Sequence, residues 1–270
     1  MRLKSPMRIE SDPWRFAPES LALLDRVAER IAPDDDGLAA WCAKYARQHR
    51  ERLAGDLRLL EREAQAGARV LEYGAVPLLM TAALAERGYA VSALDVGPER
   101  FAGAIEALGL DVRRCDVETE AVPFATDEFD VVLFNEIFEH LRINPLFTLR
   151  EALRVLRPGG HLLLSTPNLR SLRGLKNLLL EGEAYAASAD VYRQYEKLET
   201  LGHMGHVREY TTKEVTALLT RLGFVVDKVV YRGGHGRGPT GLVERLAPSW
   251  RPFFAVCARK PDAPLEGELT

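Results

Sequence analysis

The chain has 270 residues, of which 47% are hydrophobic and 28% charged, a composition typical of a folded protein with a sizeable core. Its formal net charge of -3 provides no general attraction to phosphate backbones, so we expect no nucleic-acid partner. The three cysteines, Cys42, Cys115 and Cys257, are too few and too widely spaced for a disulfide framework or a four-cysteine zinc site.

The predicted elements begin with helices and continue as alternating strands and helices. Residues 18–66 carry apolar and charged positions at helical spacing, interrupted at 33–37, so we expect residues 1–66 to form an N-terminal helical cap. Residues 67–258 alternate short apolar runs with amphipathic segments. This alternation predicts an α/β fold with a mostly parallel sheet, helices on both faces and ligands at the carboxyl ends of the strands. The runs are 68–74, 89–96, 110–117, 128–136 and 159–168, with helices at about 78–87, 98–108 and 145–156.

The alternation pauses over residues 168–210, which indicates an inserted lid that could cover an acceptor as a mobile segment. A helix and two strands, 224–231 and 253–258, complete the domain, and residues 259–270 read as a mobile polar tail. The first residues lack an apolar signal core, and the longest apolar stretch, 74–85, is too short to cross a bilayer. We therefore expect a cytoplasmic protein with no membrane partner.

Two residues at strand ends suggest a nucleotide site. Gly74 follows the first strand of the domain, and Asp95 ends the second. A glycine lets the backbone approach a ligand, and an acid at that second place accepts hydrogen bonds from ribose hydroxyls. Ordinary turns explain the same two residues equally well.

Three further features make the pattern specific: Asp116 after the third strand, NEIFEH at 135–140 after the fourth, and LRVLRPGGHLLLSTPN at 153–168 through the fifth. Together they resemble class I S-adenosylmethionine-dependent methyltransferases over residues 40–258. The resemblance implies a Rossmann-like sheet of seven strands, the last one antiparallel, and a set of cofactor-binding residues. In that set Glu72 and Gly74 lie beside the methionine part, Asp95 binds the ribose, Asp116 and the backbone of Val117 face the adenine, and Asn135 completes the site.

The glycine loop departs from the family pattern, because Val76 and Leu78 stand where the second and third glycines are usual. A Cβ at those places crowds a close approach to the ligand or forces the loop into another path. The alternative function is a catalytically silent module that binds a protein partner or regulates one. NAD fits less well than S-adenosylmethionine, because Pro77 has no N–H to offer a pyrophosphate.

The catalytic candidates follow the fourth strand. If that segment is helical, Glu136, Glu139 and His140 lie on one face at i, i+3 and i+4, although a helix start capped by Asn135 explains the acids too. With His206 downstream, the E-x-x-E-H pattern is similar to metal-using ubiquinone-pathway O-methyltransferases and small-RNA terminal 2′-O-methyltransferases. That similarity implies that Glu136, Glu139, His140 and His206 bind one Mg²⁺ or Mn²⁺ ion.

The expected activity is therefore transfer of a methyl group from S-adenosylmethionine to a hydroxyl of a small-molecule or glycan acceptor. Without a metal, His140 or His206 is the candidate base. An amine acceptor stays open, and the sequence does not indicate the oligomeric state. His49 and Arg50 are candidates for the cofactor carboxylate, and a surface helix accounts for them equally well.

Overall fold

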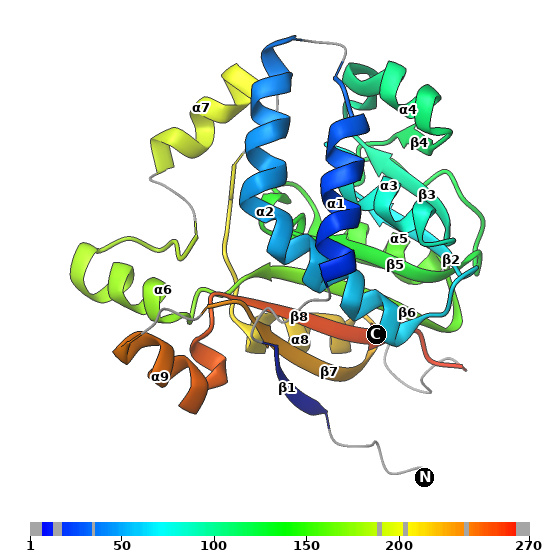
Figure 1. Ribbon diagram of the computed structural model, residues 1–270. Coiled ribbons are helices and arrows are strands. Elements are labelled where there is room, and N and C mark those ends of the chain that lie inside the picture. The colour runs from blue at the N-terminus through cyan, green and yellow to red at the C-terminus, as the bar shows by residue number, and fades with distance from the viewer. Residues whose placement is uncertain are drawn as a thin grey trace.

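A computed structural model describes residues 7–12, 18–33, 36–187, 191–201, 205–234 and 238–262. At its centre is an eight-stranded sheet with the order β1-β7-β8-β6-β5-β2-β3-β4 (Figure 1). Of these strands, β8 alone runs antiparallel to its neighbours. The strands are β1 (Arg8–Asp12), β2 (Arg69–Tyr73), β3 (Ala90–Asp95), β4 (Asp111–Arg114), β5 (Phe129–Asn135), β6 (Leu156–Pro167), β7 (Val225–Arg232) and β8 (Phe253–Arg259).

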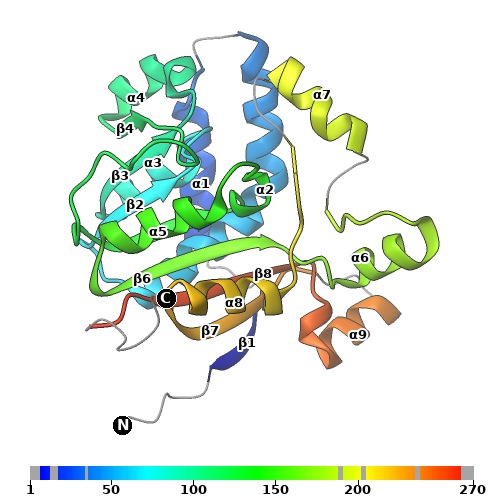
Figure 2. The same ribbon diagram turned by 180° about the vertical axis from the view of Figure 1, so that it is seen from behind.

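Helices cover both faces of the sheet. Figure 1 shows α1 and α2 over one face, and Figure 2 brings α5 and α8 on the opposite face to the front. The central strands are apolar on both sides, as strands of a doubly covered parallel sheet must be, and they separate two buried clusters. The helices are α1 (Pro18–Arg30), α2 (Asp36–Glu63), α3 (Leu79–Glu86), α4 (Ala102–Leu108), α5 (Pro145–Val155), α6 (Leu172–Lys176), α7 (Val191–Leu201), α8 (Thr212–Arg221) and α9 (Pro239–Leu246).

The predicted α/β class is confirmed, but the expected count of seven strands is wrong. The additional strand, β1, pairs in parallel with the edge of β7 and lies inside the segment predicted to be an all-helical cap. Its sequence, RIESD, is polar and Ile9 is 66% exposed, because an edge strand can be held by backbone hydrogen bonds with little side-chain burial. The helical pattern that precedes Ala68 gives no sign of it.

Two smaller differences concern the C-terminal part of the chain. The connection between the last two strands holds a helix, α9, for which the sequence analysis gave no prediction. The sheet also continues past residue 258, since Lys260 exchanges backbone hydrogen bonds with Gly159 and Gly160. Residues 263–270 of the predicted tail lie outside the described part of the chain. Among the described helices, none is both long and apolar enough to span a membrane.

The strand order fixes the position of the site. β2 pairs with β3 on one side and β5 on the other, so the direction of winding reverses between β2 and β5. Ligands of open α/β sheets bind beyond the carboxyl ends of the strands at such a switch point. The insertion after β6 leaves from and returns to the same edge, because Leu169 N donates to Tyr210 O at 3.0 Å. Its mobility stays a prediction.

Candidate active site

The loop after β2 follows a path that accommodates its unusual residues. Gly74 has a φ of 76°, and a Cβ there would lie 2.1 Å from Ile137 Cδ1, so both conformation and space require glycine. Leu78 has a φ of 68° and is completely buried. Its side chain therefore points into the core. The leucine that replaces the usual glycine thus leaves the ligand side of the loop open.

Asp95 already holds this loop in place. Its Oδ2 accepts a hydrogen bond from Val76 N at 3.0 Å and its Oδ1 accepts one from Gly97 N at 3.0 Å. Each carboxylate oxygen has a second lone pair, so the two backbone bonds orient Asp95 without using all of its capacity as an acceptor. It lies at the carboxyl end of β3, where the sequence predicted a residue that binds the ribose of the cofactor.

The other predicted cofactor residues lie along the same edge. Asp116 follows β4 in a turn, where its Oδ1 accepts from Glu118 N at 3.1 Å, and the carbonyl of Val117 accepts from Thr148 Oγ1 at 2.9 Å. Asn135 ends β5, and its buried Nδ2 has no hydrogen-bond partner among the described residues. Because a buried amide usually has a hydrogen-bond partner, a donor that lacks one among the described residues is a candidate to bind a ligand.

Glu72 differs from the others because it lies beneath the loop. It is 4% exposed, accepts a hydrogen bond from Thr81 Oγ1 at 2.6 Å, and burial raises its pKa to about 8. The contact with Thr81 ties the end of β2 to the first turns of α3. Its predicted place beside the methionine part of the cofactor stays a prediction.

The segment after β5 is not the α-helix on which the i, i+3, i+4 prediction depended. Glu136 has a φ of 51°, and a short 3₁₀ turn, Phe138–His140, follows it. The left-handed residue interrupts the helical path, so the three side chains do not follow the spacing of one helix face. The alternative of a helix capped by Asn135 is also wrong, since Asn135 belongs to the strand.

Three of the four expected metal ligands nevertheless converge. Glu139, His140 and His206 each offer an atom, and these atoms lie within 4.8 Å of one another. Both imidazole Nε2 atoms are 3.9 Å from Glu139 Oε1. Glu139 is 1% exposed, its Oε2 accepts from Thr166 Oγ1 at 2.9 Å, and its Oε1 accepts no hydrogen bond from the described residues.

Outer contacts fix which ring nitrogen faces the cluster. His140 Nδ1 is 3.1 Å from the carbonyl of Gly205, which can only accept, so Nδ1 carries the proton and Nε2 the lone pair. His206 Nδ1 is 2.9 Å from Glu209 Oε1, a carboxylate that prefers the same tautomer. Burial alone would raise the pKa of Glu209, but bonds from His206 and the Ala186 amide hold that pKa below its usual value.

Glu136, the fourth expected ligand, pairs with a residue that the sequence analysis missed. Arg52 Nη1 lies 2.8 Å from Glu136 Oε2, with both side chains nearly buried, and Arg52 Nη2 donates to Tyr45 Oη at 2.9 Å. Burial raises the pKa of Glu136 while Arg52 opposes the shift. Burial, together with the nearby Glu136, raises the pKa of Glu139 well above its usual value. The spacing of Tyr45, Arg52 and Asp56 on one face of α2 is the signal that could have found this contact.

The two neighbouring candidates on α2 do not act together. Arg50 forms an ion pair with Asp25 of α1 and so faces the other helix. The ring of His49 stacks at 4.3 Å on Tyr45, and burial, with Arg52 nearby, lowers its pKa to about 3. Neutral His49 is therefore part of the aromatic wall beside the site.

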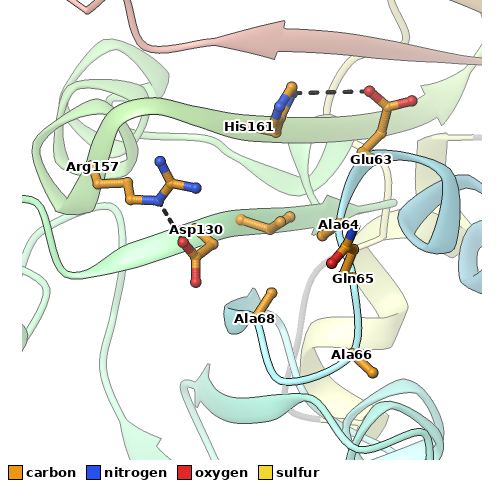
Figure 3. A pocket seen from close by; sticks show the side chains of 9 residues that line it. Glu63, Ala64, Gln65, Ala66, Ala68, Asp130, Arg157 and His161 are labelled. Carbon is orange, nitrogen blue, oxygen red and sulfur yellow. Dashed lines mark hydrogen bonds and ion pairs between the residues drawn. The ribbon is translucent and has the colours of Figure 1, made fainter.

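A separate cavity of about 370 Å³ lies at the opposite edge of the sheet (Figure 3). Asp130 and Arg157, near the amino ends of β5 and β6, form an ion pair on its wall, and His161 Nδ1 is 3.9 Å from Glu63 Oε2. Its position at the amino ends of the strands separates it from the switch point. It does not belong to the candidate active site.

Comparison with known proteins agrees with this geometry. Residues 45–229 match a family described as a methyltransferase domain, which is more than half of the chain. The fold is similar to an S-adenosylmethionine-dependent methyltransferase from Mesorhizobium loti (TM-score 0.52, 22% identity, 77% of this chain and 98% of that chain). A similar match is found with such an enzyme from Archaeoglobus fulgidus (TM-score 0.54, 15% identity, 77% and 93%). The protein thus has the fold of S-adenosylmethionine-dependent methyltransferases and belongs to the methyltransferase domain family.

Curated relatives give a more particular similarity. A ubiquinone biosynthesis O-methyltransferase from Xanthomonas oryzae pv. oryzae is 38% identical over 108 residues, covering 38% of this chain and 44% of the relative. Another from Pseudomonas entomophila is 34% identical over 113 residues, covering 40% and 48%. The chain thus spans about half the length of the curated relatives it matches, so their activity reaches this protein only as a proposal.

Proposed function

We propose that the protein transfers a methyl group from S-adenosylmethionine to a hydroxyl of a small-molecule or glycan acceptor, with a divalent cation at Glu139, His140 and His206. The observation that carries this proposal is the convergence of one carboxylate oxygen and two imidazole Nε2 atoms at the switch-point edge. The similarity to ubiquinone biosynthesis O-methyltransferases supports a hydroxyl rather than an amine acceptor.

The residues present fit S-adenosylmethionine. Asp95 and Asp116 stand at the carboxyl ends of neighbouring strands, and the buried Nδ2 of Asn135 is a donor without a partner in the described structure. Asp95 would take the ribose, Asp116 with Val117 the adenine, and Gly74 with Asn135 the methionine part. The cofactor supplies an activated methyl group, and the protein must hold the acceptor oxygen in line with it.

The residues also fit a small divalent cation. Glu139 Oε1 is a buried acceptor without a hydrogen-bond donor among the described residues, and two imidazole lone pairs face it. One carboxylate and two imidazoles suit a transition-metal ion such as Mn²⁺ better than Mg²⁺, which prefers oxygen ligands and would take this site through Glu139 and water. Such a cation supplies Lewis acidity that weakens the O–H bond of the acceptor. The protein's own part is to orient His140 through Gly205 and His206 through Glu209.

Glu136 has a different role in this proposal. Its Oε2 contacts Arg52 and keeps the guanidinium neutralised beside the site, while its Oε1 accepts no hydrogen bond from the described residues. We place Glu136 outside the ligand set because it does not belong to the three groups that converge. If no cation binds, His140 or His206 acts as the general base, since each presents its Nε2 at the same edge. A silent protein-binding module is the remaining alternative, and it predicts no cofactor binding.

Cofactor binding can be measured directly by calorimetry with S-adenosylmethionine or its demethylated product. We expect stoichiometric binding to the wild-type protein. We expect Asp95→Ala to weaken it by about 1.5 to 3 kcal/mol, or roughly 10- to 150-fold, because a charged acceptor is lost. Part of the loss comes from the loop, since Val76 N and Gly97 N lose their partner.

Asp111→Ala is a suitable control, because Asp111 lies at the amino end of β4 and accepts a hydrogen bond from Ser92. We expect this variant to bind the cofactor as the wild type does. Unchanged affinity in a folded Asp95→Ala protein would remove Asp95 from the site. Failure of the wild type to bind at millimolar ligand would favour the silent module.

A further inference from the structure

The lid helix α7 contacts the segment that carries His206 through one buried residue. Gln194 is 1% exposed, whereas its neighbours Tyr192 and Tyr195 are 75% and 56% exposed. Gln194 Oε1 accepts from His206 N at 3.1 Å, and the backbone carbonyl of Gln194 accepts from Gly205 N at 3.1 Å. Lys197 Nζ also donates to the same Oε1 at 3.1 Å. Two consecutive amides beside the cluster are thus held by a single glutamine.

Gly205 is needed for this contact to form. A Cβ at Gly205 would lie 1.9 Å from Gln194 Oε1 and 3.0 Å from Gln194 Cα, and the second of these atoms belongs to the backbone. The same glycine turns its carbonyl to His140 Nδ1 at 3.1 Å. It therefore connects α7 to one histidine of the cluster and precedes the other.

The rest of the returning segment is fixed at both ends. The amides of Val207 and Arg208 donate to the carbonyl of Glu139, at 2.8 Å and 3.3 Å. Glu209 accepts from the Ala186 amide at 2.6 Å while it orients His206. The lid thus forms part of the support of the two imidazoles, in addition to any role as a cover.

We infer that Gln194 and Gly205 are positioning residues through which α7 sets the inward direction of His140 Nε2 and His206 Nε2. Neither residue belongs to the three groups that converge, so each acts through the histidines. The functional meaning of that alignment rests on the proposed function, whereas the alignment itself does not. Without the contact to α7, the amides of residues 205 and 206 would lose their acceptors.

The test compares two substitutions of similar size. Gln194→Met removes the side-chain acceptor, and Gln194→Glu keeps an oxygen that can accept from His206 N and Lys197 Nζ. We expect Gln194→Met to speed hydrogen exchange of residues 205–210 at least tenfold. In Gln194→Glu the same residues should exchange at rates within about threefold of those in the wild type. Tyr192→Ala, an exposed position on the same helix, serves as a matched control with unchanged exchange.

Mn²⁺ binding, followed by calorimetry with the metal alone, is the second readout. A group that hydrogen-bonds a ligand directly is worth roughly 10- to 100-fold in metal affinity. Gln194 acts one contact further out, through the His206 amide, so we expect a measurable loss of at most that size for Gln194→Met and Gly205→Ala. S-adenosylmethionine affinity should stay unchanged in both variants. Wild-type exchange of residues 205–210 in Gln194→Met would overturn the inference, as would wild-type Mn²⁺ affinity in that variant. If the wild-type protein binds no Mn²⁺, the proposed metal site fails and the exchange comparison alone decides the positioning role.

Discussion

Replacing Glu139 with glutamine is expected to abolish Mn²⁺ binding, with an affinity loss of roughly 100-fold or more, beyond the range for outer partners. The physical reason is that Glu139 contributes the one carboxylate of the converging set, and its Oε1 is already free of hydrogen bonds from the described residues. Calorimetry with Mn²⁺ on the purified protein measures the effect without knowledge of the acceptor. Chelation should likewise stop turnover, and Mg²⁺ or Mn²⁺ should restore it.

Glu136→Gln is the matched control, because it changes the neighbouring carboxylate in the same way. We expect it to bind Mn²⁺ within a few-fold of wild type, since Glu136 is engaged by Arg52. Thermal melts of both variants establish that each is folded. Equal losses in the two variants would make Glu136 a fourth ligand, as the sequence resemblance implied.

Further experiments distinguish activation of the acceptor by a metal ion from activation by a general base. His206→Ala should lose Mn²⁺ and turnover while it keeps S-adenosylmethionine affinity, because Asp95 and Asp116 are untouched. If turnover persists in excess chelator and His140→Ala alone destroys it, His140 is the base and the cation has no part. Turnover that survives both treatments would place the activation of the acceptor elsewhere.

Asp56→Ala is expected to lower the free energy of unfolding by about 3 to 5 kcal/mol, which is the usual cost of leaving one buried charge without its partner. Asp56 on α2 pairs with Arg232 at the end of β7, and both side chains are 1% exposed. Arg232 also donates to the carbonyl of Arg52 at 3.4 Å, so the pair attaches α2 to the sheet beside the site. Urea unfolding followed by circular dichroism gives the measurement.

The ion pair between Asp227 and Arg259 provides the comparison, because its two side chains are 29% and 35% exposed. Asp227→Ala should cost no more than about 1 kcal/mol, since solvent screens a pair at the surface. Replacing both members of the buried pair, with Asp56→Leu and Arg232→Met together, should cost much less than Asp56→Ala. If Asp56→Ala and Asp227→Ala lower the free energy of unfolding equally, the buried ion pair does not stabilise the packing of α2 against β7.

The order of strands and helices could be predicted from the chain because each element carries its own pattern. β2, β3, β5 and β6 appear as short apolar runs, and α5 and α8 as amphipathic segments, within a few residues of their observed bounds. The carboxyl-end positions of Gly74, Asp95 and Asp116 then follow, since all parallel strands end at one edge. β1 was not predicted because a polar edge strand has almost no periodic burial to detect. α9 was missed although it is amphipathic, because it is short and follows a glycine-rich run.

The glycine loop and the acidic cluster show where local pattern stops being informative. Leu78 fits a left-handed position because the core receives its side chain, a fact that depends on how α3 packs against β2. Glu136 is likewise left-handed, and no helical spacing describes it. Three of the four expected ligands converge, and the part of Glu136 in metal binding stays a prediction.

The sequence by itself determined the fold class, the edge of the sheet that carries the site, and the residue types gathered there. Those properties depend on which residues each element buries and on the direction of the strands. Both can be predicted from the spacing of apolar residues along the chain. Only the tertiary structure decided that Arg52 forms an ion pair with Glu136 and that Gln194 accepts a hydrogen bond from the His206 amide. An ion pair or hydrogen bond between distant segments depends on which elements pack together. The residues next to either partner in the sequence do not predict that packing.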